Sequence, residues 1–343
     1  MTLLANALVI AGFLFAAEPV EPPRIGLIEF YGLRSLPVEK VRQVLRVSEG
    51  DPLPRSKEEA ELAIEKLERV QAARLQATCC EEGKAILYVG VLEKGQPSPR
   101  FREEPRGLVL LPEEVHDAYV RFLAAIYDAS QQQNLAEDLT AGHSLLSHPR
   151  ARAQQEKFIE LADRYLRVLR DVLRNSYDAE HRAIAAYVLG YVKDKKQVVP
   201  DLLYALTDPD ETVRDNALRS LAAIALLAVR KPETGILIDA SPLIDLLDSA
   251  VWTDRTNAAI GLANLTENRP EELLRQLRQR ALLPLVEMAR WRHLPHALPA
   301  FILLGRMLGM EENAIQHAWT DPAARADLIN RAAGLGAAQN KRP

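Results

Sequence analysis

Cysteine is almost absent from this sequence. The chain of 343 residues has two, Cys79 and Cys80, and they are neighbours. Adjacent residues lie outside the usual Cα separation of a disulfide, so we interpret them as ordinary thiols at the end of a strand. A vicinal redox switch and a bond to another chain are the alternatives. Two adjacent cysteines cannot supply a framework of disulfides, so a fold held together in that way is excluded.

Charge of one sign is not in excess either. The chain has 43 Lys and Arg against 47 Asp and Glu, which gives a formal net charge of −4. A protein without a basic surplus lacks the electrostatic footprint of nucleic-acid binding, so we expect no nucleic-acid partner. Aromatic residues make up only 6% of the chain and charged residues 26%. This composition is typical of Leu- and Ala-rich helical proteins.

Common catalytic motifs are also missing. The sequence contains no G-x-S-x-G, H-E-x-x-H, G-x-G-x-x-G or G-x-x-x-x-G-K-[ST] pattern. The seven histidines are scattered, apart from His293 and His296. Pro295 separates these two, and no nearby Asp, Glu or Cys completes a set of metal ligands. The sequence therefore predicts a protein that is not an enzyme and has no metal or cofactor.

The longest apolar run lies at the N-terminus. Residues 3–17 are apolar except for Asn6, and a proline-rich stretch follows. This pattern predicts a secretory signal peptide, residues 1–17, cleaved near Ala16 or Ala17. The run is shorter than the ~20 residues of a comfortable membrane span, so an uncleaved membrane anchor is the alternative. We expect a periplasmic or secreted protein whose mature chain has no transmembrane span.

Residues 24–95 predict a small α/β domain with the element order β-α-α-β-β. The expected strands and helices are residues 24–31, 36–47, 56–70, 73–78 and 85–92. Val38, Val41 and Leu45 are spaced to form one helical face. Ser56 and Glu59 stand three apart, as in the capping box that begins a helix.

Several features of this segment carry a resemblance to a known family. They are Gly32 after the first strand, the helix from Val38, the break at residues 50–53, the second helix ending near Leu67, and Val91, Leu92 and Glu93 in the closing strand. The segment resembles a POTRA domain, the periplasmic module of outer-membrane assembly and secretion proteins. It lacks the aromatic residue that usually follows the second helix, and no β-barrel follows. The resemblance implies a sheet edge that accepts a partner strand; the alternative is an α/β domain without that role.

The next two segments differ in composition. Residues 96–112 contain four prolines among charged residues, which predicts an extended linker. Residues 113–176 predict a helical region with two amphipathic faces separated by a long loop at residues 131–149. The first face comprises Val115, Tyr119, Phe122, Leu123 and Ile126.

A repeated pattern follows the helical region. An Ala, a Leu four positions later and then a small residue recur in segments that end at Gly190, Ala222, Ala263 and Gly305. The small residues are 32, 41 and 42 positions apart, and two-helix solenoid units repeat every ~40–47 residues. The first three Ala residues are each preceded, three positions earlier, by Arg182, Arg214 and Arg255.

The run Asp208-Pro209-Asp210-Glu211-Thr212-Val213-Arg214, with Ala217 and Leu221 after it, resembles the HEAT repeat, including the bacterial HEAT-like group. The resemblance implies a solenoid over residues 177–310, in which the Asp and Arg residues are structural. The expected ladder that ties one repeat to the next consists of Arg182, Arg214, Arg255, Asp208 and Asp210. We expect Asp210, and Thr253 with Asp254, to cap helix starts.

The fourth unit departs from the pattern, because Ala297 replaces the arginine and Pro295 and Pro299 enter the helix. Residues 311–343 are expected to form a C-terminal helical cap and tail.

The predicted fold is therefore multidomain, with a small POTRA-like α/β domain followed by an all-α HEAT-like solenoid. Its expected function is an exported, non-catalytic protein–protein interaction scaffold in cell-envelope assembly. The partner, a protein or peptide, is expected on the concave second helices at residues 197–206, 241–247 and 271–291. A periplasmic chaperone is one alternative. An enzyme of the HEAT-like bilin lyase type is another, because some HEAT-like proteins attach bilins to light-harvesting proteins.

Overall fold

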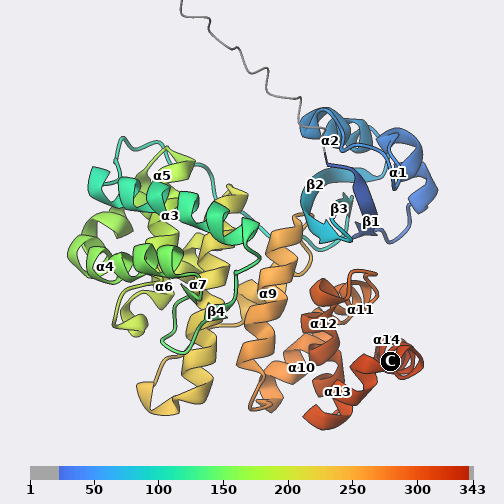
Figure 1. Ribbon diagram of the computed structural model, residues 1–343. Helices are drawn as coiled ribbons and strands as arrows, with labels where there is room; N and C mark the ends of the chain where they lie inside the picture. The colour runs from blue at the N-terminus through green and yellow to red at the C-terminus, as the bar shows by residue number, and fades with distance from the viewer. Residues whose placement is uncertain (1–22, 340–343) are drawn as a thin grey trace, which may run out of the picture.

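A computed structural model describes residues 23–339 of the chain. It contains a small α/β domain and a larger array of helices (Figure 1). The predicted signal peptide, residues 1–17, lies outside the described residues, as do the side chains of Cys79 and Cys80. No helix among residues 23–339 combines the length and the apolar character that crossing a bilayer requires.

The α/β domain has the predicted order β-α-α-β-β. Its elements are β1 (Ile25–Tyr31), α1 (Val38–Leu45), α2 (Lys57–Glu65), β2 (Val70–Glu81) and β3 (Lys84–Glu93). The closing strand β3 lies in the centre of the sheet, parallel to β1 and antiparallel to β2. Ser56 caps α2 as predicted, since its hydroxyl accepts a hydrogen bond from the backbone N–H of Glu59 at 3.1 Å.

The sheet is covered on both faces. Helices α1 and α2 pack on one face, where Ile28, Val41 and Ile64 are buried in the domain's own core. Tyr31 and Tyr88 belong to the other face and to the core of the helical array. The α/β domain therefore shares a hydrophobic core with the rest of the chain.

The helical array begins with a hairpin and continues in helix pairs. The hairpin is α3 (Glu113–Gln131) and α4 (Pro149–Asn175), and the loop between them carries β4 (Glu137–Asp138) and β5 (Leu145–Leu146). The first helices of the following units, which stack in sequence order, are α5 (Ala179–Leu189), α7 (Glu211–Arg230), α9 (Trp252–Leu265) and α12 (Leu294–Met307). The remaining elements are η1 (Lys195–Gln197), α6 (Val199–Ala205), η2 (Pro232–Thr234), α8 (Ser241–Leu246), α10 (Glu271–Arg280), α11 (Leu282–Ala289), α13 (Glu312–Thr320) and α14 (Pro322–Gln339).

Small residues allow the first helices to approach one another closely. A Cβ atom on Gly190 would lie 2.3 Å from the Ser220 hydroxyl oxygen, and one on Gly261 would lie 3.9 Å from the Cα atom of Ala222. The repeated Ala and Leu positions, such as Ala217, are buried in the seams between the helices. The apolar surface of each unit is thus sealed by its neighbours, as in solenoid arrays.

Two local predictions were wrong. The helix expected over residues 271–291 is divided into α10 and α11. Pro284 explains the break, because it has no N–H to donate and its ring would clash with the carbonyl group of Arg280. Thr253 and Asp254 do not cap a helix: α9 begins at Trp252, and Asp254 is fully buried against Arg214.

The α/β domain packs against the C-terminal half of the array, beside α9, α11 and α12 (Figure 1). The Tyr31 hydroxyl donates a hydrogen bond to the carbonyl oxygen of Ala250 at 2.7 Å. The Tyr88 ring stacks on Trp252 with 4.7 Å between centroids, and Trp291 makes edge contacts with both tyrosines. Residues 96–112 then run back to the start of the array at α3.

Candidate functional site

The three ladder arginines are almost completely buried. Each donates to a carboxylate that lies later in the chain. The pairs are Arg182 with Asp208 at 3.0 Å, Arg214 with Asp254 at 2.9 Å and Arg255 with Glu287 at 2.8 Å. Arg182 and Arg214 also donate to two backbone carbonyls each, just before their own helices. These charges therefore join successive units.

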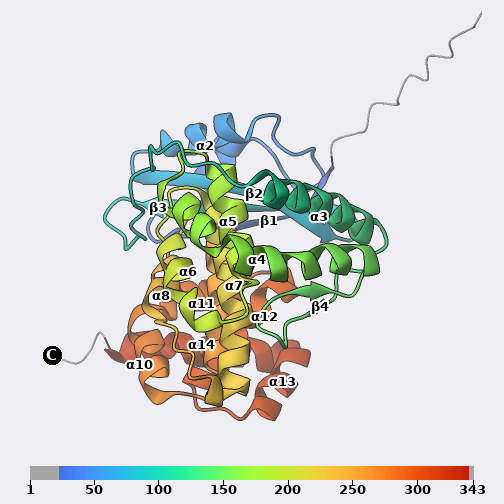
Figure 2. The same ribbon diagram turned by 90° about the vertical axis from the view of Figure 1, so that its left-hand side faces the viewer.

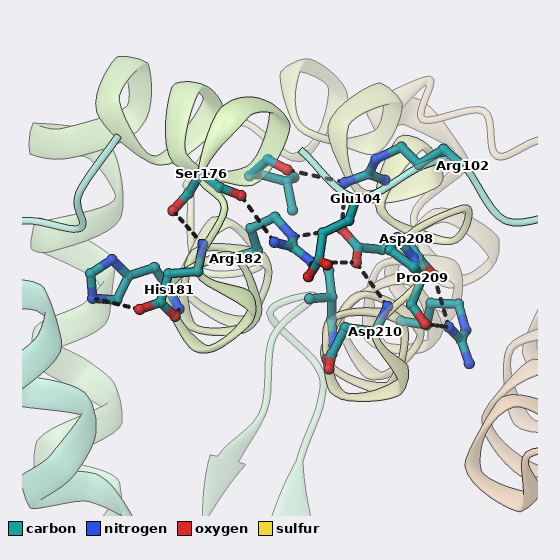
Figure 3. A network of polar contacts seen from close by, with 12 residues as sticks. Arg102, Glu104, Ser176, His181, Arg182, Asp208, Pro209 and Asp210 are labelled. Atoms are coloured by element: carbon teal, nitrogen blue, oxygen red, sulfur yellow. Dashed lines mark hydrogen bonds and ion pairs between the residues drawn. The ribbon is translucent and has the colours of Figure 1, made fainter. Parts of the chain in front are cut away.

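The two aspartates of the predicted ladder have different roles. Asp208 is fully buried and accepts from the guanidinium group of Arg182 (Figure 3). Asp210 caps α7, because its carboxylate accepts from the backbone N–H groups of Thr212 and Val213 at 2.9 and 3.1 Å. An acid at this position also interacts favourably with the helix dipole.

The N-terminal part of the chain covers the ladder. The centroid of the Phe101 ring lies 3.9 Å from the guanidinium carbon of Arg214. The centroid of the Tyr31 ring lies 4.6 Å from the guanidinium carbon of Arg255. Arg102 donates to Asp208 and to the carbonyl oxygen of Leu173. Figure 3 shows Arg102 and Glu104 of the linker beside the Arg182–Asp208 pair. Because its own chain fills this edge, the ladder offers little surface to a ligand.

The predicted partner-binding helices present little exposed surface in the first two units. Helix α6 has seven residues and α8 has six, and most of their apolar side chains are buried. Arg170 and Arg174 of α4 both bind the carboxylate of Asp201 on α6 at 2.7 Å. Binding at residues 197–206, 241–247 and 271–291 stays a prediction.

A cleft of about 630 Å³ lies elsewhere, between α3, residues 132–148 and the first helices α5, α7 and α9. Figure 2 shows α3 and α4 at the front of the array, with β4 below them. The apolar wall of the cleft includes Tyr119, Phe122, Leu123, Ile126, Leu135 and Ile260. Ligand sites are commonly concave and mostly apolar, with a few polar groups, and this cleft has that character.

Gln155 of α4 holds the loop over the cleft. Its side chain is buried, and its carbonyl oxygen accepts from the backbone N–H of Leu146 at 2.6 Å. Its amide nitrogen donates to the hydroxyl of Tyr191 at 3.0 Å, and that hydroxyl donates to the carbonyl oxygen of Ser144 at 2.9 Å. Burial raises the pKa of Tyr191 well above its ordinary value, so this hydroxyl keeps its proton at neutral pH.

Three charged side chains line the cleft. Asp215 and Arg219 stand one turn apart on α7, and Glu137 of the loop lies 3.5 Å from Arg219. Asn257 of α9 donates to the carboxylate of Asp215. Burial raises the pKa of Asp215, and Arg219 partly opposes that shift.

His143 lines the same cleft as a neutral side chain. Burial, together with the charge of Lys195, lowers its pKa to about 4. The amino group of Lys195 lies 3.1 Å from Nδ1 of His143 and donates to the carbonyl oxygen of Gly190 at 2.6 Å. These contacts fix Lys195 behind the loop.

The sequence reasoning missed this cleft. It placed Tyr119, Leu123 and Ile126 on one face of an amphipathic helix without predicting an opening there, whereas Leu123 is 48% exposed and all three line the cleft. Asp215 and Arg219, four positions apart and so on one face of α7, were the available sign of a polar opening. The interpretation of residues 131–149 as a loop did not predict that this segment would fold back onto the array.

His293 and His296 lie together, with 4.2 Å between ring centroids. Nδ1 of His296 lies 2.7 Å from the hydroxyl oxygen of Tyr88, so this ring belongs to the contact between the α/β domain and the array. Among the side chains that the structure describes, which exclude Cys79 and Cys80, no group of three or more is suited to hold a metal ion.

Comparison with known families supports the repeats. A model of the family described as HEAT repeats matches residues 166–263. This range contains Arg182, Arg214 and Arg255 together with α5, α7 and most of α9. No curated protein matches the chain. The HEAT-like interpretation is confirmed for this part of the chain and suggests a protein-interaction scaffold, whereas the POTRA resemblance stays a prediction.

Proposed function

We propose that this chain is an exported, non-catalytic scaffold of the cell envelope, and that it holds a protein partner in the cleft beside α3. The observation that carries the proposal is the exposed apolar surface at the mouth of the cleft. Leu123 and Leu135 line the cleft and are 48% and 47% exposed. Val120, Leu123 and Tyr127 are exposed and share one face of α3, so the apolar surface continues outside the cleft. Such a patch is typical of a protein-binding site.

The cleft is a better site than the edge of the POTRA-like sheet. On β2, the backbone N–H groups of Ala73 and Leu75 donate to the carboxylates of Glu65 and Glu61 at 3.0 and 2.7 Å. A partner strand would have to displace these side chains, which protect the edge. At the other edge, β1, the backbone N–H of Ile28 donates to Glu49 at 3.1 Å and its carbonyl oxygen accepts from Arg292 at 2.8 Å. Strand addition is therefore the weaker alternative.

The enzyme alternative has one observation in its favour. Asp215, Arg219 and Glu137 converge on the cleft, as catalytic groups do. However, Arg219 lies close to the carboxylate of Glu137, and the hydroxyl of Tyr191 is engaged in holding the loop. The exposed apolar stripe on α3 fits a scaffold without any catalytic group, and it also fits a lyase whose substrate is a protein.

The test is to express the full chain with its own N-terminus, fractionate the cells and capture partners by crosslinking. The variant Leu123→Asp changes the mouth of the cleft at an exposed position. The matched control is Leu237→Asp, since Leu237 is 87% exposed and lies outside the cleft. We expect a processed chain in the periplasmic fraction, and a defined partner captured by the wild type and by Leu237→Asp but not by Leu123→Asp.

Several results would count against the proposal. A chain that stays in the cytosol with Met1 intact would contradict the proposed export. Equal capture of a partner by Leu123→Asp and Leu237→Asp would show that the partner does not bind at the cleft. Capture of many unfolded proteins in place of a defined partner would favour the chaperone alternative.

A further inference from the structure

We infer that the cleft selects a partner segment in which a lysine or arginine adjoins an apolar side chain. The inference rests on the proposed function, because it specifies the chemistry of the protein partner. It is carried by the arrangement of charges and apolar walls among the residues that line the cleft.

The charges of the cleft leave one carboxylate in excess. Glu137 and Asp215 are acidic, and Arg219 is basic. His143 is neutral near pH 7, because its pKa is lowered to about 4. Lys195 does not line the cleft: its amino group is held behind the loop by the carbonyl oxygen of Gly190, and burial lowers its pKa to about 7, which reduces its charge near neutral pH. A cation on the partner would therefore complement the cleft.

Of the two acids, Glu137 is the one that a partner can reach directly. Glu137 lies on the loop at the rim. In its ion pair with Arg219, the side chains of both residues are partly exposed to solvent. Exposed pairs of this kind contribute only about 0–1 kcal/mol, so a second cation can compete for the carboxylate. Asp215 lies deeper, on α7, where Asn257 donates to its carboxylate, so it adds negative charge behind Glu137.

The apolar walls set the second requirement. Tyr119, Phe122 and Ile260 line the cleft near these acids. A volume of about 630 Å³ is ample for an aliphatic or aromatic side chain with its flanking backbone. The stripe of Val120 and Tyr127 on α3 extends the apolar surface outside the cleft, which favours a polypeptide over a small molecule.

The test uses a phage-displayed library of random peptides about nine residues long, selected on the purified full chain. The key variant is Glu137→Lys, which changes the excess from one negative to one positive charge at an exposed loop position. The matched control is Glu233→Lys, which makes the same change in net charge at an exposed residue of η2 outside the cleft. The apolar requirement is tested with Leu123→Ser, which removes the apolar side chain without adding a charge and should weaken the enrichment of apolar residues.

We expect the wild type and Glu233→Lys to enrich peptides with Lys or Arg within two positions of an apolar residue. Glu137→Lys should enrich acidic residues there instead, and a peptide selected on the wild type should bind it about tenfold more weakly, or ~1.4 kcal/mol. Enrichment of neutral or acidic peptides by the wild type would overturn the inference, as would no enrichment or equal binding to Glu137→Lys and Glu233→Lys. If partner capture still depends on Leu123 in those cases, the proposed scaffold stands and only its charge preference fails.

Discussion

At the scale of single residues, the buried ladder makes each of its acids costly to remove. Asp254 is fully buried and accepts from the guanidinium group of Arg214 and from the hydroxyl of Ser249. Asp254→Ala would leave Arg214 buried without a counter-charge. We expect the free energy of unfolding to fall by about 3–5 kcal/mol, measured by urea denaturation followed by circular dichroism.

The control for this change is Asp327→Ala, which removes an exposed ion pair with Arg331. Exposed pairs contribute only about 0–1 kcal/mol, so its unfolding curve should stay close to that of the wild type. Equal losses in the two variants would show that the buried ladder has no special role in stability.

Glu93 is a second buried acid whose charge should contribute to stability in a pH-dependent way. Its buried carboxylate accepts from the backbone N–H groups of Arg34, Ser35 and Leu36 and from the Ser35 hydroxyl. Burial raises its pKa, but these donors outweigh burial and lower the pKa from 4.5 to about 2. A depressed pKa stabilises the fold above the unfolded value, and this contribution is lost as the pH falls from 4.5 towards 2.

Glu93→Gln should therefore destabilise the chain by about 1.5–3 kcal/mol at pH 7, because it weakens bonds to a charged group. The difference from the wild type should shrink below pH 4.5. Urea midpoints measured between pH 2 and pH 7 check both parts. A difference that stays constant over this range would contradict the assigned role of the charge.

The sequence predicted the arginines of the ladder better than their carboxylate partners. Repeat spacing identified Arg182, Arg214 and Arg255, because each stands at the same place in its helix. It did not identify Asp254 or Glu287 as their partners. Those acids follow their arginines by 40 and 32 positions, and units of unequal length give no fixed spacing to search for.

At the scale of elements, the close contact between α5 and α7 depends on Gly190. An added Cβ would lie 2.3 Å from the hydroxyl oxygen of Ser220 and 2.8 Å from its Cβ. Gly190→Ala should therefore destabilise the array by about 1–3 kcal/mol through overpacking. Ser220→Gly opens the space, so the double variant should lose less than the sum of the two single losses. Strict additivity in thermal or urea unfolding would contradict this contact.

Helix existence was easier to predict than helix continuity or the packing of loops. The apolar period predicted helices around α3, α5, α7, α9 and α12, because their buried faces repeat regularly. The break before Pro284 and the course of residues 132–148 depend on a single residue and on tertiary contacts. For the same reason the cleft was not predicted, since one of its walls is that loop.

At the scale of the whole molecule, the sequence could not predict where the α/β domain lies relative to the array. The contact joins residues more than 200 positions apart, such as Tyr31 with Ala250 and Tyr88 with His296. No local pattern records which face of the sheet meets the array. The nearly continuous apolar runs of β1 and β3 predict only that both faces need a cover. The array supplies one cover, and α1 and α2 supply the other.

Gly90 of β3 tests this arrangement. A Cβ atom on it would lie 1.9 Å from the carbonyl oxygen of Ala250 and 2.5 Å from the hydroxyl oxygen of Tyr31. Because backbone blocks the first of these positions, Gly90→Ala must push the α/β domain away from the array and weaken the Tyr88–Trp252 stack. We expect faster proteolysis in residues 96–112 and a red shift of tryptophan fluorescence. Gly334→Ala, where no atom lies within 4 Å, is the control and should change neither. A Gly90→Ala chain as resistant as the wild type would mean that the domain does not dock through this face.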